Sequence, residues 1–167
     1  MSTAEPIAVL VQRARLGDQA AFTELVHRFQ AMAYGYAYSI LGDFPLAEDA
    51  AQGAFVEAYR KLDDLREPAA FPGWFRRIEF KHCDRLTRAR RFVTVPLDAL
   101  GELASERASP HEIVEQRERD RVVRQAIHGL PEGQRIATTL YYIGGYSQRE
   151  VAVFLGIKPS TVKNRLY

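Results

Sequence analysis

Two adjacent residues, His82 and Cys83, are the pair whose types could supply a catalytic nucleophile and its general base. Adjacent residues of a helix point about 100° apart and do not face each other, which disfavours this pairing. The other histidines, His27, His111 and His128, lie far apart and show no metal-ligand spacing. A single cysteine also excludes an internal disulfide and a multi-cysteine zinc site. We therefore expect no enzyme, no metal site and no cofactor.

A second group of candidate residues surrounds a turn signature near the C-terminal end of the sequence. Ser147 and Glu150 have the spacing of a capping box, and Gly156 permits a tight turn. Pro159 suits the first turn of a following helix, and Ala152 is small where two helices must cross closely. Because these features occur together, they predict a helix-turn-helix rather than an ordinary helical hairpin.

The second helix of this motif presents a polar face. With Val162 directed inward, Ser160 and Asn164 lie opposite the core, and Thr161 and Lys163 lie on the flanks. Such a face suits the major groove of DNA, with base contacts at its centre and phosphate contacts at its edges. The candidate duplex-binding residues are Arg149, Ser160, Thr161, Lys163, Asn164 and Tyr167.

Charge is divided between two successive segments of opposite sign. Residues 43–64 contain six acids against two bases, and residues 76–91 contain seven bases against two acids. Two solvated helix faces would also produce this pattern, but so abrupt a change of sign favours two different partners. The outward acidic side is formed by Glu48, Asp49, Gln52 and Glu57, and the basic side by Arg76, Arg77, Lys81, Arg85 and Arg88.

Apolar periodicity predicts the helices that position these side chains, and Asp18 and Asp43 are the expected caps of the second and third helices. We expect helices over residues 7–16, 19–41, 43–62, 73–91, 111–128 and 132–142, followed by the helix-turn-helix. Between residues 92 and 109 the periodicity fades and proline, glycine and serine accumulate, as in an interdomain connection. The sequence therefore predicts an all-α fold of two small helical domains joined by a linker.

Composition further limits the class of protein. With 167 residues and 47% apolar content, the chain can fill one ordinary hydrophobic core or two small ones. Its apolar runs are far shorter than the roughly 20 residues that cross a bilayer, and residues 1–6 lack the layout of a secretion signal. We therefore expect a cytoplasmic protein with no membrane insertion.

Short segments along the chain carry a family resemblance. Residues 130–132, 141–142, 146–152 and 161–166 resemble region four of the extracytoplasmic-function (group IV) RNA polymerase sigma factors, within the sigma-70 family. Residues 17–22 and 47–55 resemble the first two subregions of region two, and residues 71–78 resemble its promoter-reading part. The segments follow the order and spacing of that family over most of residues 7–91 and 111–167.

This resemblance implies a domain order and a function. Residues 1–95 would form sigma region 2, residues 96–110 a linker, and residues 111–167 sigma region 4. The protein would bind core RNA polymerase and direct promoter recognition and melting. Its partners would be core RNA polymerase, promoter DNA, and an anti-sigma factor or a fused regulatory domain.

The resemblance also assigns each candidate surface a role. The acidic side would dock on the clamp helices of the polymerase's largest subunit, with Asp49 and Gln52 at the centre. Phe71 and the five basic side chains would hold the minus-ten element, where a base is unstacked as the strands open. The helix-turn-helix would read the minus-thirty-five element. Trp74 shares a helix face with Ile78, so we expect it in the core.

The residues leave one alternative function open. A two-domain helix-turn-helix regulator could bind DNA without ever contacting polymerase. The acidic segment at residues 43–64 separates the two interpretations, because such a regulator would need an effector pocket or a dimer interface instead.

A last expectation concerns the C-terminal helix. Tyr167 lies about nine residues into the helix that begins near Pro159, and a helix this short is marginal by itself. The basic tail that members of the family carry beyond this point is absent. We therefore expect the sequence to be a fragment of a longer protein.

Overall fold

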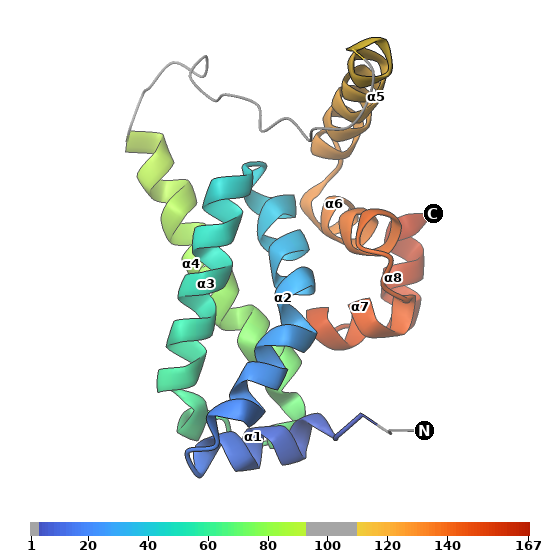
Figure 1. Ribbon diagram of the computed structural model, residues 1–167. Coiled ribbons are helices and arrows are strands. Elements are labelled where there is room, and N and C mark those ends of the chain that lie inside the picture. The colour runs from blue at the N-terminus through green and yellow to red at the C-terminus, as the bar shows by residue number, and fades with distance from the viewer. Residues whose placement is uncertain (1–3, 93–109) are drawn as a thin grey trace.

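The structure, a computed structural model, describes residues 4–92 and 110–167, and for residues 110–115 it describes the backbone alone. These two ranges contain helices and no strand, which confirms the predicted all-α class (Figure 1). Within the described ranges, no helix combines the length and apolar character that crossing a membrane requires. Residues 96–109 of the predicted linker lie outside the described residues, and Pro110 begins a helix.

The first three helices begin and end where local signals predict. They are α1 (Ile7–Arg15), α2 (Gln19–Leu41) and α3 (Phe44–Arg60). The Asp18 side chain accepts a hydrogen bond from the backbone N–H of Ala21, and Asp43 accepts one from Leu46, so each aspartate caps the helix that follows. Gly42 ends α2 in the left-handed conformation, at φ 65°.

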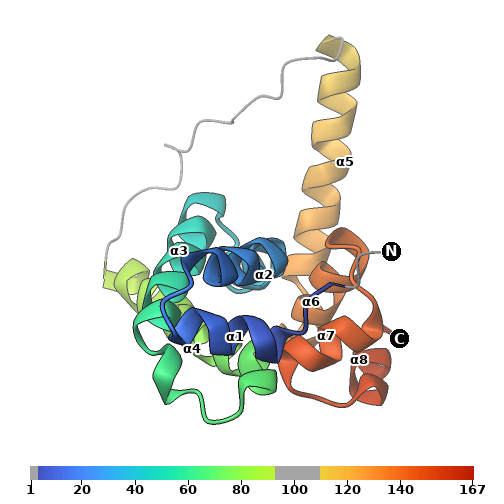
Figure 2. The same cartoon turned by 60° about the horizontal axis from the view of Figure 1, so that its bottom comes forward.

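A fourth helix, α4 (Phe71–Phe92), follows two short 3-10 turns, η1 (Leu62–Asp64) and η2 (Pro68–Ala70). It begins two residues before the predicted start at Gly73, because Pro72 lies in the first turn, where a helix tolerates a missing N–H. Helices α2, α3 and α4 pack side by side, and α1 crosses one end of this bundle (Figures 1 and 2).

The C-terminal part consists of α5 (Pro110–His128), α6 (Glu132–Thr138), the π-turn η4 (Thr139–Ile143), α7 (Gln148–Leu155) and α8 (Pro159–Leu166). The single helix predicted over residues 132–142 is therefore partly wrong. The Gly144 N–H bonds to the carbonyl of Thr139, five residues earlier, at 2.9 Å, and this wider turn replaces the last α-helical turn. Helix α5 extends away from the rest (Figure 2).

The predicted helix-turn-helix is confirmed in its local details. The Ser147 hydroxyl accepts a hydrogen bond from the Glu150 N–H at 3.2 Å, and the Glu150 carboxylate accepts one from the Ser147 N–H at 2.8 Å. Gly156 provides the left-handed turn at φ 66°. Val151 and Val162 are fully buried between α7 and α8.

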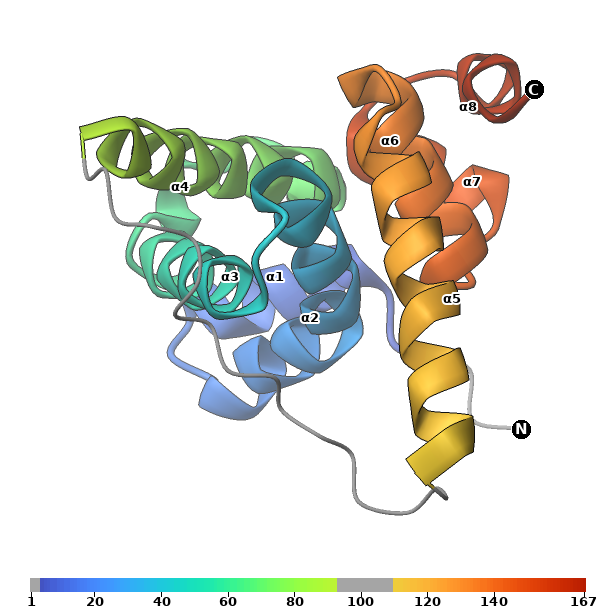
Figure 3. The same cartoon turned by 90° about the horizontal axis from the view of Figure 1, so that it is seen from above.

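The N-terminal and C-terminal parts share one hydrophobic core, which the sequence did not predict. The Tyr36 ring of α2 meets the Phe154 ring of α7 edge to face at 5.6 Å between centroids. A Cβ at Gly35 would lie 3.2 Å from Leu140, so glycine permits this close approach of α2 to η4. Figure 3 shows α6 and α7 alongside the N-terminal bundle. The two parts therefore form a closed arrangement.

Candidate protein- and DNA-binding surfaces

Helix α3 separates an alanine-rich inner side from a mixed outer face. Ala47, Ala50 and Ala54 are fully buried, and these small side chains let the neighbouring helices of the bundle approach α3 closely. The outer face exposes acidic, polar and apolar groups. We define the α3 outer face as Glu48, Asp49, Gln52, Val56 and Tyr59.

Two residues of the α3 outer face differ from the sequence interpretation, which missed Val56 and placed Tyr59 on the inward apolar stripe of this helix. Val56 is 51% exposed and Tyr59 is 46% exposed, and each lies a helical turn or two beyond Gln52. Apolar side chains on an outward helix face were the available signal, since the inner stripe was already filled by alanines and Phe55. Together with the acids they form a surface that can bury apolar area and attract a basic partner.

Tyr34 of α2 is a further residue that the sequence interpretation missed. Burial raises the pKa of its hydroxyl, and a hydrogen bond to Glu48 and the charge of Asp49 raise it further. The phenol therefore stays protonated, and its O–H can donate a hydrogen bond to the Glu48 carboxylate. In addition, the Gln52 side-chain amide donates to Glu48 at 3.3 Å. The orientation of Glu48 is thus held from two helices.

Glu57 does not belong to the α3 outer face, which corrects the prediction. Its side chain is 23% exposed, and its carboxylate accepts a hydrogen bond from Lys61 at 2.7 Å and lies 2.7 Å from Nε2 of His82. The hydrogen bond from Lys61 and then that from His82 lower the pKa of Glu57. Because both oxygens are occupied, Glu57 joins α3 to α4 instead of facing a partner.

Helix α4 carries the predicted basic residues on a continuous exposed side. Arg77, Lys81, Arg85 and Arg88 are all exposed, and their spacing of three or four residues places them on one face. We call these four residues the α4 basic strip. Arg88 also forms an ion pair with Asp84, one turn earlier on the same helix.

Arg76 differs from the α4 basic strip because the C-terminal part partly covers it. It is half-buried and lines an open groove together with Arg77, Val153 and Gly156. Burial raises the pKa of the neighbouring Tyr36 hydroxyl to about 12, while a hydrogen bond with Arg76 acts in the opposite direction. Arg76 therefore lies where α2, α4 and α7 meet.

Phe71 is part of the core, which corrects its assignment as a DNA contact. Its side chain is 0% exposed and its ring lies 5.5 Å from that of Phe29 and 5.8 Å from that of Phe75. The physical reason is helical spacing, because Phe71 shares the inward face with Phe75 and Ile78. Trp74 packs against the core as predicted, but it is only partly buried and lines the same groove as Arg76.

The polar face of α8 has the predicted exposure. Ser160, Lys163 and Asn164 are exposed, Tyr167 is 82% exposed, and Thr161 is half-buried on the flank. The residue at the start of α7, Arg149, is also exposed. The exposed side chains of α8 thus leave the buried side of this helix to Val162. Their contact with DNA stays a prediction.

Two groups inside α4 show why this helix offers no reactive thiol. Cys83 is fully buried, and burial is the largest cause that raises the pKa of its thiol to about 12. Glu79 is itself 0% exposed, and neither of its carboxylate oxygens has a hydrogen-bond partner. The sequence interpretation missed Glu79, although its position four residues after Phe75 and four before Cys83 placed it on the inward stripe.

Comparisons with known proteins point to one family over both parts of the chain. Protein-family models described as "Sigma-70 region 2" and "Sigma-70, region 4" match residues 25–92 and 120–167. The ECF RNA polymerase sigma-E factor of Escherichia coli (strain K12) is 33% identical over 170 residues, covering 95% of this chain and 87% of that protein. The RNA polymerase sigma-H factor of Pseudomonas aeruginosa is 31% identical over 176 residues, covering 100% of this chain and 91% of that protein.

A solved structure shares the fold across nearly the whole chain. CnrH, solved in complex with the cytosolic domain of CnrY, is similar with a TM-score of 0.62 and 27% sequence identity. The match covers 97% of this chain and 90% of the CnrH chain. The similarity therefore includes both the N-terminal bundle and the helix-turn-helix.

Proposed function

Because this chain belongs to the extracytoplasmic-function RNA polymerase sigma factors of the sigma-70 family, we propose which of its surfaces serve polymerase and which serve DNA. Its function as a sigma factor is to direct promoter recognition by RNA polymerase. A regulator that never contacts polymerase is thereby set aside. The observation that carries the assignment of surfaces is the opposite charge of two exposed faces, on α3 and on α4.

The α3 outer face docks on core RNA polymerase. Its acids steer an approaching basic surface, and Val56 and Tyr59 supply apolar area at the contact. Asp49 and Gln52 lie at its centre, with Glu48 held in place by Tyr34. The C-terminal part packs on other sides of the bundle, so this face is exposed in the closed arrangement (Figure 3).

The α4 basic strip holds the opened minus-ten strand. Its four cations are spaced along one face, as contacts to successive phosphates of a single strand require. The loop at residues 62–70 directly precedes α4 and supplies the surface that meets an unstacked base. Melting needs no catalytic group, because binding the separated strand shifts the equilibrium toward the open duplex.

The polar face of α8, with Arg149 of α7, reads the minus-thirty-five duplex. Ser160 and Asn164 stand at its centre, where side chains of a recognition helix reach base edges, and Lys163 lies on its flank, where it reaches phosphates. The capping box of Ser147 and Glu150 fixes the first helix of the motif against the second.

A regulatory protein binds this sigma factor in the cytoplasm, where polymerase works. The solved structure of CnrH in complex with the cytosolic domain of CnrY supports a protein partner for this chain, whether an anti-sigma factor or a fused domain. Association with polymerase supports the location.

Charge reversal on α3 tests polymerase docking. We expect Asp49→Arg to weaken the affinity for core RNA polymerase by at least about tenfold, because it places a cation opposite a basic partner. The measurement is a titration of fluorescently labelled protein with core enzyme, at low and high salt. Asp64→Arg, the same change at an exposed acid of η1 outside the α3 outer face, is the matched control. If Asp49→Arg binds core enzyme like the control, with unchanged helical circular dichroism, the docking assignment is wrong.

A further inference from the structure

Arg15, near the end of α1, reaches a loop almost fifty residues further along the chain. Its Nε donates a hydrogen bond to the carbonyl of Leu62 at 3.1 Å, and its Nη2 donates one to the carbonyl of Leu65. Nε also lies 4.0 Å from the carboxylate of Asp63. The side chain of Arg15 is 23% exposed. The guanidinium is therefore directed at the loop and not at solvent.

The two carbonyls mark the place where the loop leaves the core. Leu62 and Leu65 are each only 4% exposed, so their side chains anchor the backbone on either side of η1. The Leu62 carbonyl also accepts a hydrogen bond from the Leu65 N–H at 3.3 Å, so the guanidinium adds a second donor there and joins that carbonyl to the carbonyl of Leu65. A planar guanidinium offers two N–H donors in a fixed geometry, which a lysine ammonium does not. Arg15 thus fixes the direction in which the chain continues from Leu65.

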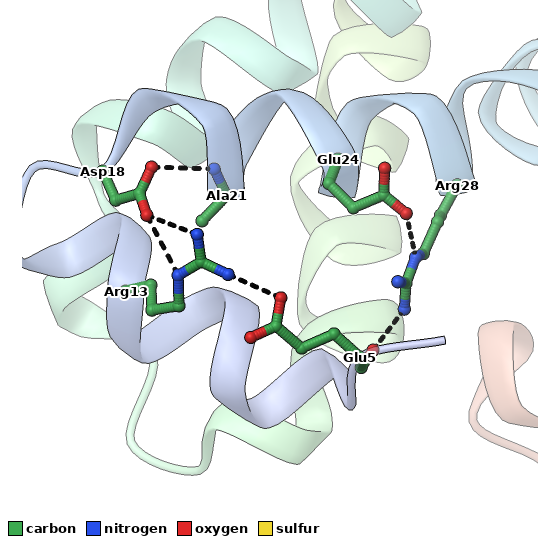
Figure 4. Close-up of polar contacts among 6 residues, drawn as sticks. All are labelled: Glu5, Arg13, Asp18, Ala21, Glu24 and Arg28. Atoms are coloured by element: carbon green, nitrogen blue, oxygen red, sulfur yellow. Dashed lines mark hydrogen bonds and ion pairs between the residues drawn. The ribbon is translucent and has the colours of Figure 1, made fainter. Parts of the chain in front are cut away.

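Helix α1, which carries Arg15, is itself held firmly against α2. Arg13 forms ion pairs of 2.6 Å with both Glu5 and Asp18 (Figure 4). Arg28 of α2 donates to the carbonyl of Glu5 at 2.5 Å and pairs with Glu24 at 2.7 Å. The buried side chains of Leu10, Val11 and Ala14 complete the contact. Exposed ion pairs such as those of Arg13 add little stability, so these buried side chains are the main support from which Arg15 acts.

Beyond the anchored carbonyls, the loop exposes the groups that face a ligand. Arg66, Glu67, Ala69 and Ala70 are exposed. Ala69 and Ala70 also line the groove that contains Arg76 and Arg77. The loop is therefore continuous with the α4 basic strip, and a strand that follows the strip reaches it.

We infer that Arg15 is a positioning residue for base selectivity at the minus-ten element, acting through the loop at residues 62–70 without touching DNA. The inference rests on the proposed function of that loop. The Nε and Nη2 of Arg15 each donate to a protein carbonyl, and these two bonds direct the guanidinium at the loop. Loss of Arg15 leaves both leucine anchors and all four cations of the α4 basic strip in place. Total affinity for single strands is then retained while discrimination among bases is lost.

The test uses the full 167-residue chain assembled with core RNA polymerase. A library of single-stranded DNA with randomised sequence is bound, and the bound fraction is sequenced to give the enrichment of each base at each position. We expect the unmodified protein to prefer its best base over its worst by about tenfold or more at one or more positions. Arg15→Ala should reduce this ratio to within about twofold while the amount of library bound changes little. Arg15→Lys, which keeps the charge, should recover part of the ratio.

Arg13→Ala is the matched control, because it removes the same charge from the same helix without a contact to the loop. It should keep the full enrichment ratio, which separates positioning from a general loss of α1 stability. Unchanged enrichment with Arg15→Ala would overturn the inference and leave the proposed function intact. Absence of enrichment with the unmodified protein would overturn both.

Discussion

At the scale of single residues, the most unusual group is the buried carboxyl of Glu79. It is 0% exposed, and its two oxygens and the Nε of Arg76 are buried without partners. Burial raises the pKa of Glu79 well above its ordinary value, and the charge of Arg76 only partly opposes this. Tyr36 and Cys83, which also face this site, have pKa values raised to about 12 and stay neutral near neutral pH. Burial therefore favours the protonated form of Glu79 in the folded protein.

This protonation predicts how stability depends on pH. The folded state keeps the proton of Glu79 at pH values where the unfolded chain, with an ordinary pKa, has released it. The stabilisation is therefore complete below the ordinary pKa of glutamate and is lost as pH rises toward the raised folded value, by at most about 1.4 kcal/mol per pH unit. Glu79→Gln should remove this decline, as measured by urea unfolding at about pH 5 and about pH 8.

An exposed carboxyl provides the comparison for Glu79. Glu67→Gln changes the same functional group on the same part of the chain, at a side chain in solvent. Glu67→Gln should therefore keep the decrease in the free energy of unfolding between about pH 5 and about pH 8. An equal decline in Glu79→Gln and in the unmodified protein would show that this carboxyl is ionised in the folded state.

At the scale of elements, α4 divides its residues among three environments. Phe71, Phe75 and Ile78 are in the core, the α4 basic strip is exposed, and Arg76 lies between them under α7. Periodicity predicts the first two groups, because both follow from 3.6 residues per turn. The partial burial of Arg76 could not be predicted, because it depends on a helix more than seventy residues away.

The α4 basic strip predicts a change in the salt dependence of binding. Each phosphate contact to a single strand contributes about 0.7 to the slope of log affinity against log salt. Replacing Arg85 and Arg88 by alanine should therefore reduce the slope by up to about 1.4 for single-stranded promoter DNA. The measurement is fluorescence anisotropy over a range of salt concentrations.

The control for this prediction removes two arginines elsewhere. Arg13 and Arg60 are exposed on α1 and α3, outside the α4 basic strip. Their double alanine variant loses the same net charge and should keep the original slope. A slope that stays unchanged when Arg85 and Arg88 are replaced would mean that neither side chain contacts the strand.

The helix ends show which features a sequence can predict and which it cannot. Asp18, Asp43 and Ser147 were all predicted as caps, because a cap depends on residues within one turn. The π-turn at residues 139–143 and the hydrogen bond that the Glu57 carboxylate accepts from His82 were not predicted. Both depend on packing between elements, which a local pattern does not contain. Most residues of the exposed surfaces were thus predicted. The contacts that draw Glu57 toward His82 and bury Phe71 in the core were not predicted.

At the scale of the whole molecule, two parts that the sequence predicts as separate domains share a core. Arg135 of α6 donates to the carbonyl of Ser39 in α2 at 2.6 Å, beside the contact between Tyr36 and Phe154. Phe154 is 1% exposed, although the contact between α7 and α8 within the helix-turn-helix uses a different residue of α7, Val151. The closed arrangement is therefore built from specific contacts and not from incidental proximity.

This shared core predicts a single cooperative unfolding transition for the described parts. Phe154→Ala should destabilise the protein by about 3–5 kcal/mol, because it removes a buried ring from the contact. We also expect the transition to divide in two, as each part then unfolds by itself. Val153→Ala, a 56% exposed neighbour on α7, should change stability by no more than about 0.5 kcal/mol. Differential scanning calorimetry distinguishes these outcomes, and one unshifted transition in Phe154→Ala would contradict the prediction.

The contact between Tyr36 and Phe154 joins two parts of one chain, so dilution cannot separate it as it separates a dimer. Any ligand that needs Arg76 uncovered binds only the fraction of molecules in which α7 has moved away. Its apparent Kd equals the intrinsic Kd divided by that fraction, at every protein concentration. For any such ligand the interdomain contact thus acts as a constant multiplier on affinity, set by side chains that the ligand never touches.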